Sequence, residues 1–362
     1  MKEAKKKLKC VFARLKKADH LALVGLIVVV VLAAAVWLVT KDFFFRQEKI
    51  VQSVQGEAAA EEKLQYRHPL TGELMDEQLE TLLRVFGVVV DNQIDAWPQF
   101  GIEKAFLVFE APVEASISRF IAFFSDEDDI RQIGPVRSAR PYFLDWNNEF
   151  DALFAHVGGS NAALDQIATG GTFDLNEYWN GEYFWRARDR FAPHDVFTSI
   201  RRMMNYTSLK EKDGSAPERL YETWTFKDSN PSGLSVGARV EFDEPSYVVD
   251  WKYDSTLNGY FRDQAGEPHL TGGGIQIFAN NVAIAVTDIR VLDEVGRRSV
   301  RTVGEGEAWL LQDGKVIDAK WKKPSATERL KFYDSKTGEE LLMNAGITWI
   351  EVVGGKDAFE IE

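Results

Sequence analysis

The chain has 362 residues, a net charge of −13 and a single cysteine. Nucleic-acid binding depends mainly on neutralising phosphates, so a chain this acidic is not expected to bind nucleic acid. One cysteine excludes an internal disulfide, and the length is ample for the fold to be held by hydrophobic cores. That residue, Cys10, precedes the first apolar run and therefore cannot be a lipidated cysteine that follows a signal region.

The first 40 residues predict a membrane anchor. Residues 1–20 carry eight lysines and arginines against two acids, whereas residues 21–40 carry no charge. About 20 apolar residues can cross a hydrocarbon core as a helix, and the cationic flank places the N-terminus in the cytoplasm. A cleaved signal peptide would have a shorter apolar region followed by small residues. We therefore expect a single-pass cell-membrane helix at 21–40, a basic cytoplasmic tail at 1–20, and extracytoplasmic domains whose net charge is −19.

Residues 41–64 predict a polar stalk, and a first globular domain is expected at 65–210. Short apolar runs indicate strands at 85–93, where the run is rich in β-branched residues, and at 104–114, 118–128 and 150–160. Helices are expected within 134–150, after Ser160 or Asn161 as N-cap, and at 200–209. This alternation predicts a layered, mixed α/β-sheet first domain in a chain of the α+β class.

The second half of the chain has a different pattern. Residues 211–238, rich in Gly, Ser, Pro and charged residues, indicate a linker. Residues 239–355 alternate apolar and polar residues between turn sequences such as QDGK and SKTGEE, which is typical of β-hairpins. A β-rich second domain is therefore expected. Its many tryptophans and tyrosines are expected in the core, with a carbohydrate-stacking face as the alternative.

The string IGPVRSARPYF contains two closely spaced arginines in a part of the chain whose net charge is negative. It places Arg137 and Arg140 three residues apart, with Ser138 between them. That spacing would put both arginines on one face near the start of the helix expected within 134–150. Backbone N–H groups and the helix dipole favour anions at the same end.

Further arginines lie at turns and strand ends of the first domain: Arg119, Arg186 and Arg190. The planar guanidinium group suits a carboxylate or a phosphate, so together these residues are candidates for an anion-binding site. The alternative is that each arginine pairs with an acid of the same domain; the candidates are Glu110, Glu114, Asp145, Asp151 and Asp189.

The string HVGGS connects an expected strand to an expected helix. Gly158 and Gly159 would let backbone amides approach a ligand between His156 and Ser160. The string matches neither of the common glycine-rich phosphate motifs. A tight turn with a capping serine is the alternative.

His194, beside Asp195 in a proline-containing loop, could form an acid–base pair with that neighbour. A structural hydrogen-bonding role is the alternative. The histidines are far apart and no HExxH motif is present, so no metal site is expected. No cofactor is expected either.

Several strings resemble the YerB-like family. Those of its N-terminal domain are HPLTGE (68–73), IGPVRSARPYFLD (133–145), FDALFAHVGGSNAAL (150–164) and FWRARDRFAPHDVFTS (184–199). Those of its C-terminal domain are WKYDSTLNGYFRDQAGEPHL (251–270), NNVAIAVTDIRVLD (280–293), VGEGEAWLLQDGKVIDAKWKK (303–323) and NAGITWIEVV (344–353).

The resemblance implies a bacterial envelope protein from a family of unknown function whose members are often lipoproteins. It also implies a mixed α+β domain followed by a β-rich domain, and it brings no established catalytic residues. The family's arginine-rich turns fall on Arg119, Arg137, Arg140 and Arg186. This chain departs from the family by having an apolar anchor in place of a lipidated cysteine.

Together these features predict one extracytoplasmic cleft, lined by the arginines and the 156–160 turn, that binds an anionic group. A cell-wall or phosphorylated envelope polymer would supply that group. One alternative is an envelope enzyme acting on phosphorylated glycans, with Arg137, Arg140 and His194 stabilising charge. The other is a structural protein that docks an envelope partner.

Overall fold

The computed structural model describes residues 29, 31–38, 40, 41 and 65–362, and residues 31–38 are helical. Among these residues, no helix combines the length and hydrophobicity needed to cross a membrane. The tail predicted at 1–20, much of the span predicted at 21–40 and nearly all of the stalk predicted at 41–64 lie outside the described residues. Gln65–Glu362 form one compact unit.

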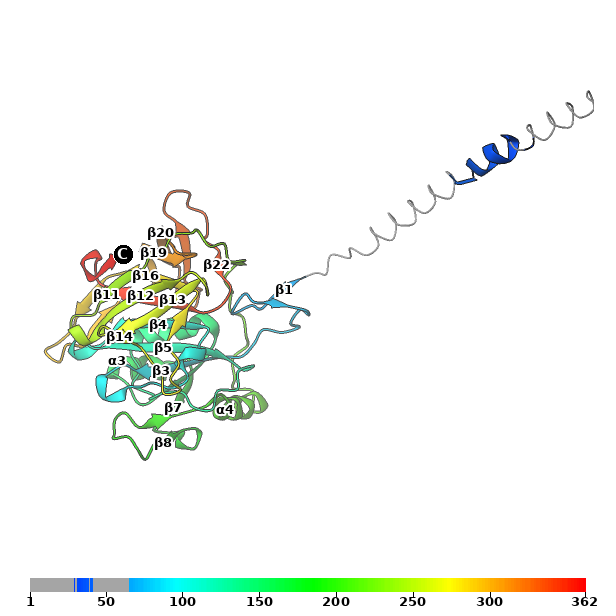
Figure 1. The fold of residues 1–362 in the computed structure, drawn as a ribbon. Helices are drawn as coiled ribbons and strands as arrows, with labels where there is room; N and C mark the ends of the chain where they lie inside the picture. The colour runs from blue at the N-terminus through cyan, green and yellow to red at the C-terminus, as the bar shows by residue number, and fades with distance from the viewer. Residues whose placement is uncertain (1–28, 30, 39, 42–64) are drawn as a thin grey trace, which may run out of the picture. The chain divides into compact units, whose positions relative to one another are not determined.

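A ten-stranded mixed sheet runs through this unit and takes strands from both halves of the chain (Figure 1). In sheet order its strands are β21 (Lys331–Asp334), β20 (Lys315–Lys323), β19 (Gly304–Gln312), β16 (Asn281–Val286), β23 (Thr348–Val353), β4 (Leu107–Pro112), β5 (Ser118–Ser125), β3 (Val85–Asp91), β6 (Leu153–His156) and β7 (Phe173–Asn176). The four strands predicted in the first half are β3, β4, β5 and β6, so those predictions are confirmed.

A second sheet belongs to the C-terminal half. It contains β14 (Glu267–Pro268), β13 (Gly259–Gln264), β12 (Val248–Asp254), β11 (Ala238–Glu241) and β24 (Phe359–Ile361), with β15 (Phe278–Ala279) paired to β13. Four short pairs complete the strands: β1 (Tyr66–Arg67) with β2 (Leu74–Met75), β8 (Trp185–Arg186) with β9 (Val196–Phe197), β10 (Phe226–Lys227) with β22 (Met343–Asn344), and β17 (Ile289–Val291) with β18 (Arg298–Val300). The chain is thus mixed α/β and rich in sheet.

The ten-stranded sheet separates two hydrophobic cores. Alternate residues of β3 enter different cores: Val88 and Val90 enter one, and Val85 and Val89 enter the other. The first core also takes side chains from β11, β12, β13 and α4 (Ile200–Lys212), and the second takes them from α2 (Pro141–Asn147) and α3 (Asn161–Ala168). Each core therefore lies on one face of the shared sheet and uses residues from both halves of the chain.

Two of the three α-helices in residues 65–362, α3 and α4, agree closely with the sequence predictions. Ser160 caps α3, and its Oγ accepts a hydrogen bond from the Ala163 N–H (3.3 Å). Ser199 caps α4 in the same way through the Arg202 N–H (3.4 Å). Serine at this position satisfies an N–H group that the helix itself leaves unpaired.

The helix predicted within 134–150 is confirmed, but it begins only at Pro141, so Arg137 and Arg140 precede it. Residue Arg140 precedes a proline, a position that disfavours the α conformation, and its backbone is extended. Residues 133–140 run as extended chain, with bridges from Val136 and Ala139 to neighbouring segments. Arg137 and Arg140 consequently do not share a helix face.

The segment 211–238, predicted as a linker, packs against the body. The Tyr221 hydroxyl donates to the Leu83 carbonyl (2.8 Å), and Trp224 Nε1 donates to the Leu330 carbonyl (2.7 Å). Both aromatic side chains belong to the second core. This connection therefore contributes to the packing of the two halves on each other.

Buried charged groups lie where β4 and β23 join the two halves. Glu110 and Glu351 are register partners in this parallel pair, and both are fully buried. Arg262 Nη2 donates to Glu110 (2.7 Å), and Trp251 Nε1 donates to Glu351 (2.8 Å). Burial and then the charge of Glu110 raise the pKa of Glu351 well above its ordinary value, which favours the protonated form.

Candidate functional site

Most residues predicted as ligand-binding lie along one edge of the ten-stranded sheet. The parallel strands β3 and β6 end at this edge, with Asp91 and His156 as their last residues. Strand β5 is antiparallel to β3 and places Arg119 opposite Asp91. The extended segment 137–140 bonds to β3 and to the turn that follows β6. Ligand sites in open α/β sheets form at the carboxyl ends of such strands.

Glu114 holds two of the predicted arginines. Arg140 Nε donates to Glu114 (3.1 Å), Arg140 Nη2 bonds both carboxylate oxygens, and Arg119 Nη2 donates to the same carboxylate (3.3 Å). Both guanidinium groups also reach the Ser138 carbonyl, at 3.1 Å from Arg119 and 3.5 Å from Arg140. Burial opposes ionisation of Glu114, but the arginine charges outweigh it and lower its pKa to about 2.

Asp91 holds the third arginine of the edge and a histidine. Its carboxylate lies 2.8 Å from Arg137 Nε and 2.7 Å from His194 Nδ1. Burial would raise the pKa of Asp91, but the His194 hydrogen bond and the charges of Arg119 and Arg137 lower it overall. The pairing of His194 with Asp195 that the sequence suggested is wrong. Its partner comes from a strand 103 positions away along the chain.

The other two predicted arginines tie loops together. Arg186 bonds Asp195 (2.9 Å) and Glu177 (3.0 Å). Arg190 donates to the carbonyls of Ala96 (2.7 Å) and Pro98 (2.6 Å). Every predicted arginine thus has protein partners, and four of the five pair with an acid, although only Glu114 was among the acids suggested by the sequence.

The turn at 156–160 is satisfied by its own surroundings. The buried His156 ring contacts the Gly158 carbonyl (2.6 Å) and Asp174 (2.7 Å), and the Gly158 N–H donates to Asn176 Oδ1 (3.0 Å). Gly158 has a φ of +58°, and a Cβ there would meet the Tyr178 ring at 2.8 Å. Glycine is therefore needed here for backbone conformation and packing.

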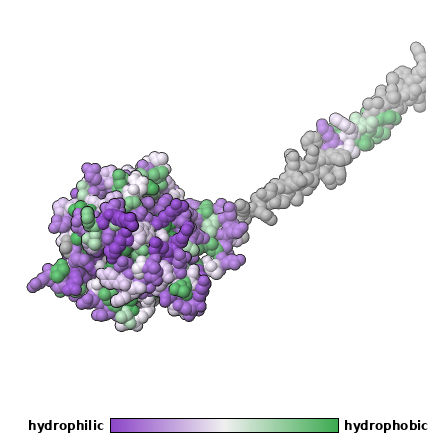
Figure 2. Space-filling view, turned by 90° about the horizontal axis from the view of Figure 1, so that it is seen from below, coloured by the Kyte–Doolittle hydropathy of each residue, from purple (hydrophilic) through white to green (hydrophobic). Residues whose placement is uncertain are grey.

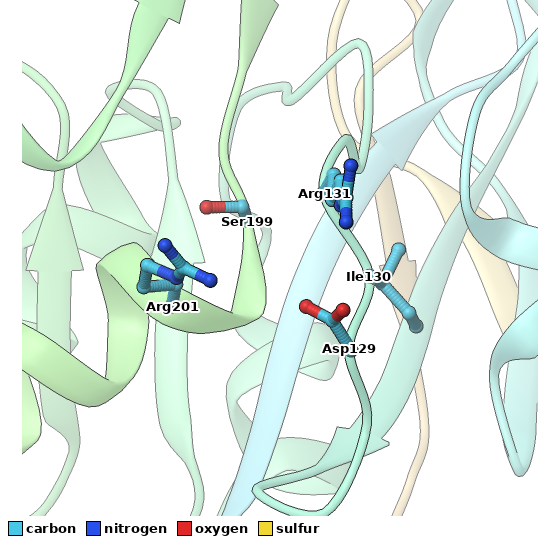
Figure 3. A pocket seen from close by; sticks show the side chains of 5 residues that line it. All are labelled: Asp129, Ile130, Arg131, Ser199 and Arg201. Carbon is cyan, nitrogen blue, oxygen red and sulfur yellow. The ribbon is translucent and has the colours of Figure 1, made fainter.

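A pocket of about 430 Å3 lies where the loop after β5 faces the start of α4, and it contains arginines that the sequence reasoning missed. Figure 3 shows Ser199 and Arg201 on the helix side and Asp129, Ile130 and Arg131 on the facing loop. Arg131 and Arg201 are exposed, and within residues 65–362 neither guanidinium has a hydrogen-bond or ion-pair partner that would neutralise it. The sequence did contain a signal for Arg201. This residue lies two positions after Ser199, the N-cap of α4, and therefore in the first turn of the helix.

A larger pocket of about 640 Å3 lies beside the Asp91 cluster. It is lined by Asp95, Trp97, Asp189, Arg190, Phe191, Ala192, Pro193 and His194. Of the predicted site residues, this pocket contains only Arg190 and His194, and Arg137 approaches it through a 3.4 Å contact to the Pro193 carbonyl. Across the described part of the chain, no group of three or more His, Cys, Asp or Glu side chains is arranged to hold a metal ion.

Comparison with known proteins identifies the family. The family "Protein of unknown function (DUF3048)" matches with its N-terminal domain at residues 70–214 and with its C-terminal domain at 238–350. A protein of Bacillus subtilis (strain 168) named "Putative lipoprotein YerB" is 32% identical over 334 residues, which are 90% of this chain and 97% of that protein. The chain belongs to this YerB-like family, as its sequence strings predicted.

A solved structure supports the same conclusion. The crystal structure of YerB protein from Bacillus subtilis matches with a TM-score of 0.72 at 32% sequence identity. The match covers 82% of this chain and 99% of that one. The two proteins therefore share their fold over both family domains. In this chain the two domains contribute strands to the same ten-stranded sheet.

Proposed function

We propose that this chain is a membrane-anchored protein of the bacterial cell envelope that binds an anionic group outside the cytoplasm. The uncharged run at 21–40 and its cationic flank support the anchor. The relative from Bacillus subtilis carries "lipoprotein" in its name, which supports attachment to a membrane by another chemical route. An anchor of either kind leaves the large acidic unit facing the envelope.

The two unneutralised arginines of the smaller pocket carry the proposed binding function. Arg131 and Arg201 come from different elements and line one cavity, and their charges have no acid partner within residues 65–362. Guanidinium groups bind carboxylates and phosphates through paired N–H donors. Asp129 in the same lining limits the net charge, so a small anion with a few neighbouring carboxylate or phosphate groups fits better than a dense polyanion.

The arginines predicted from the sequence have a supporting place in this proposal. Arg119 and Arg140 are buried and share Glu114, so their donors are largely used. Arg137 differs because 20% of its side chain is exposed and it reaches the Pro193 loop. A ligand that extends along this end of the molecule could contact Arg137, whereas Arg119 and Arg140 would hold the edge in shape.

The experiment is a thermal-shift titration of the full chain in detergent with inorganic pyrophosphate and with citrate. A ligand specific for the folded state adds about 2.7 kcal/mol at a hundred times its dissociation constant. We expect this shift to disappear in Arg131→Ala/Arg201→Ala. Arg290→Ala, which removes an exposed arginine of β17, is the matched control and should keep it.

The outcomes separate three possibilities. Loss of the shift in Arg137→Ala but not in Arg131→Ala/Arg201→Ala would move the anion to the sheet edge. An equal loss in Arg290→Ala would mean only nonspecific charge attraction. Absence of any shift with either anion would contradict the proposal and favour a protein that docks an envelope partner.

A further inference from the structure

The larger pocket, lined by residues 95–97 and 189–194, has a chemistry that differs from that of the anion pocket. Two of its lining residues are acids, Asp95 and Asp189. Asp189 makes no hydrogen bond with any residue of 65–362 and interacts only with the charge of Arg190, and Asp95 receives only a long side-chain contact (3.4 Å) from Gln93. The pocket therefore presents carboxylate oxygens that are free to accept hydrogen bonds.

The cations of this pocket are already engaged. Both terminal nitrogens of Arg190 donate to the Ala96 and Pro98 carbonyls, which holds the 189–194 loop against the 96–98 turn. The charge of Arg137 is opposed by Asp91. With acceptors free and donors used, the lining disfavours an anion and suits a ligand that donates hydrogen bonds.

Aromatic side chains supply the apolar part of the lining. Trp97 is half-buried, and its Nε1 donates to the Asn92 carbonyl (3.0 Å), which fixes the indole ring. Phe191 is 90% exposed, a large apolar side chain held in water at the pocket. The face of the molecule seen in Figure 2 is mainly hydrophilic with small hydrophobic spots.

His194 adds a hydrogen-bonding group of defined orientation. Its Nδ1 donates to the fully buried Asp91 carboxylate at 2.7 Å. In the neutral imidazole this bond fixes the proton on Nδ1 and leaves Nε2 as an acceptor. Nε2 has no hydrogen-bond partner among residues 65–362, and His194 lines the pocket.

We propose that this pocket binds a neutral polyhydroxylated ring, as in a sugar residue of an envelope glycan. Its apolar ring face would stack on Trp97 and Phe191, while its hydroxyl groups donate to Asp95, Asp189 and His194 Nε2. Stacking surfaces combined with a few convergent acceptors give both affinity and orientation for such a ligand. This site is separate from the anion pocket and does not depend on it.

The test measures binding of chitotriose, an uncharged trimer of N-acetylglucosamine, to the full chain in a detergent without a sugar headgroup. Saturation-transfer NMR and calorimetry give contacts and affinity. We expect Phe191→Ala and Asp189→Asn each to weaken binding about tenfold, because each removes one contact. Trp179→Ala is the matched control, since Trp179 is 80% exposed and lies outside the pocket lining.

The histidine gives a second readout. Bound sugar should shift the NMR signals of the His194 ring and leave those of the fully buried His156 unchanged. Equal affinity of the parent, Phe191→Ala and Asp189→Asn would overturn the proposal, as would an absence of binding at millimolar sugar. Arg131→Ala/Arg201→Ala should bind the trimer normally. Loss of sugar binding in that variant alone would place the sugar in the anion pocket and also overturn it.

Discussion

The sheet edge and the pocket at α4 use the same residue type for opposite purposes. At the edge, the side chains of Arg119 and Arg140 are 3% and 8% exposed and share the carboxylate of Glu114. At the pocket, Arg131 and Arg201 are exposed and unneutralised within the described unit. The sequence pattern drew attention to the first group, because Arg140 belongs to the string IGPVRSARPYF and Arg119 to the arginines at turns and strand ends.

The difference shows what burial does to an arginine. A guanidinium taken out of water needs a carboxylate and carbonyl oxygens to offset its lost hydration, so the fold supplies them. An exposed guanidinium is hydrated and needs no partner, so it remains available to a ligand. Predicting which arginines bind an anion therefore requires their burial, a property that spacing along the chain does not give.

Glu114→Gln is expected to have the largest effect on the stability of the folded protein. The change leaves Arg119 and Arg140 buried without their carboxylate, and we expect a loss of about 3 kcal/mol in the free energy of unfolding. Denaturant unfolding measures it. The control is Glu305→Gln, which breaks an exposed pair with Lys322 (3.6 Å) and should cost less than about 0.5 kcal/mol. Similar losses in both variants would show that burial does not distinguish these pairs.

Acid stability tests the same carboxylate by a different route. The pKa of Glu114 is about 2 in the folded protein against an ordinary 4.5. Its contribution is therefore complete above about pH 5 and is lost as the pH falls toward 2, a change of about 3 kcal/mol. We expect the parent to lose more stability than Glu114→Gln between pH 5 and 2. Parallel pH profiles would mean that the carboxylate is not held by the arginines.

The smallest effect on stability is expected at the pocket. Arg131→Ala/Arg201→Ala removes two solvated side chains, so the free energy of unfolding should change by less than about 0.5 kcal/mol while the response to pyrophosphate is lost. Denaturant unfolding and the thermal-shift titration, run on the same samples, separate the two quantities. A loss of stability comparable to that of Glu114→Gln would assign these arginines a structural role.

Local sequence patterns predicted much of the fold. The apolar runs of β3 to β6, the Ser160 cap of α3 and the helix α4 were recognised because these features depend on neighbours within a few residues. The helix within 134–150 was also predicted, but local pattern did not fix its start, which lies at Pro141 because the preceding residue is extended. The strings that resemble the YerB-like family extended the prediction to the order of the two domains in the chain.

The pairing of distant segments was decided by tertiary structure alone. No spacing rule links Asp91 to His194 or Glu114 to Arg140, since these pairs form only when β3, β5 and the 137–140 segment meet at one edge. The joint between β4 and β23, and the single ten-stranded sheet that results, likewise depend on strands more than 200 residues apart in the sequence.

The sequence by itself determined the apolar N-terminal run, the acidic character of the large unit, the local strands and helices, and the family. The tertiary structure decided which charges are buried, which arginines stay free and which pockets exist. The physical reason is that secondary structure responds to short-range periodicity, whereas desolvation and ion pairing depend on which remote side chains share a space.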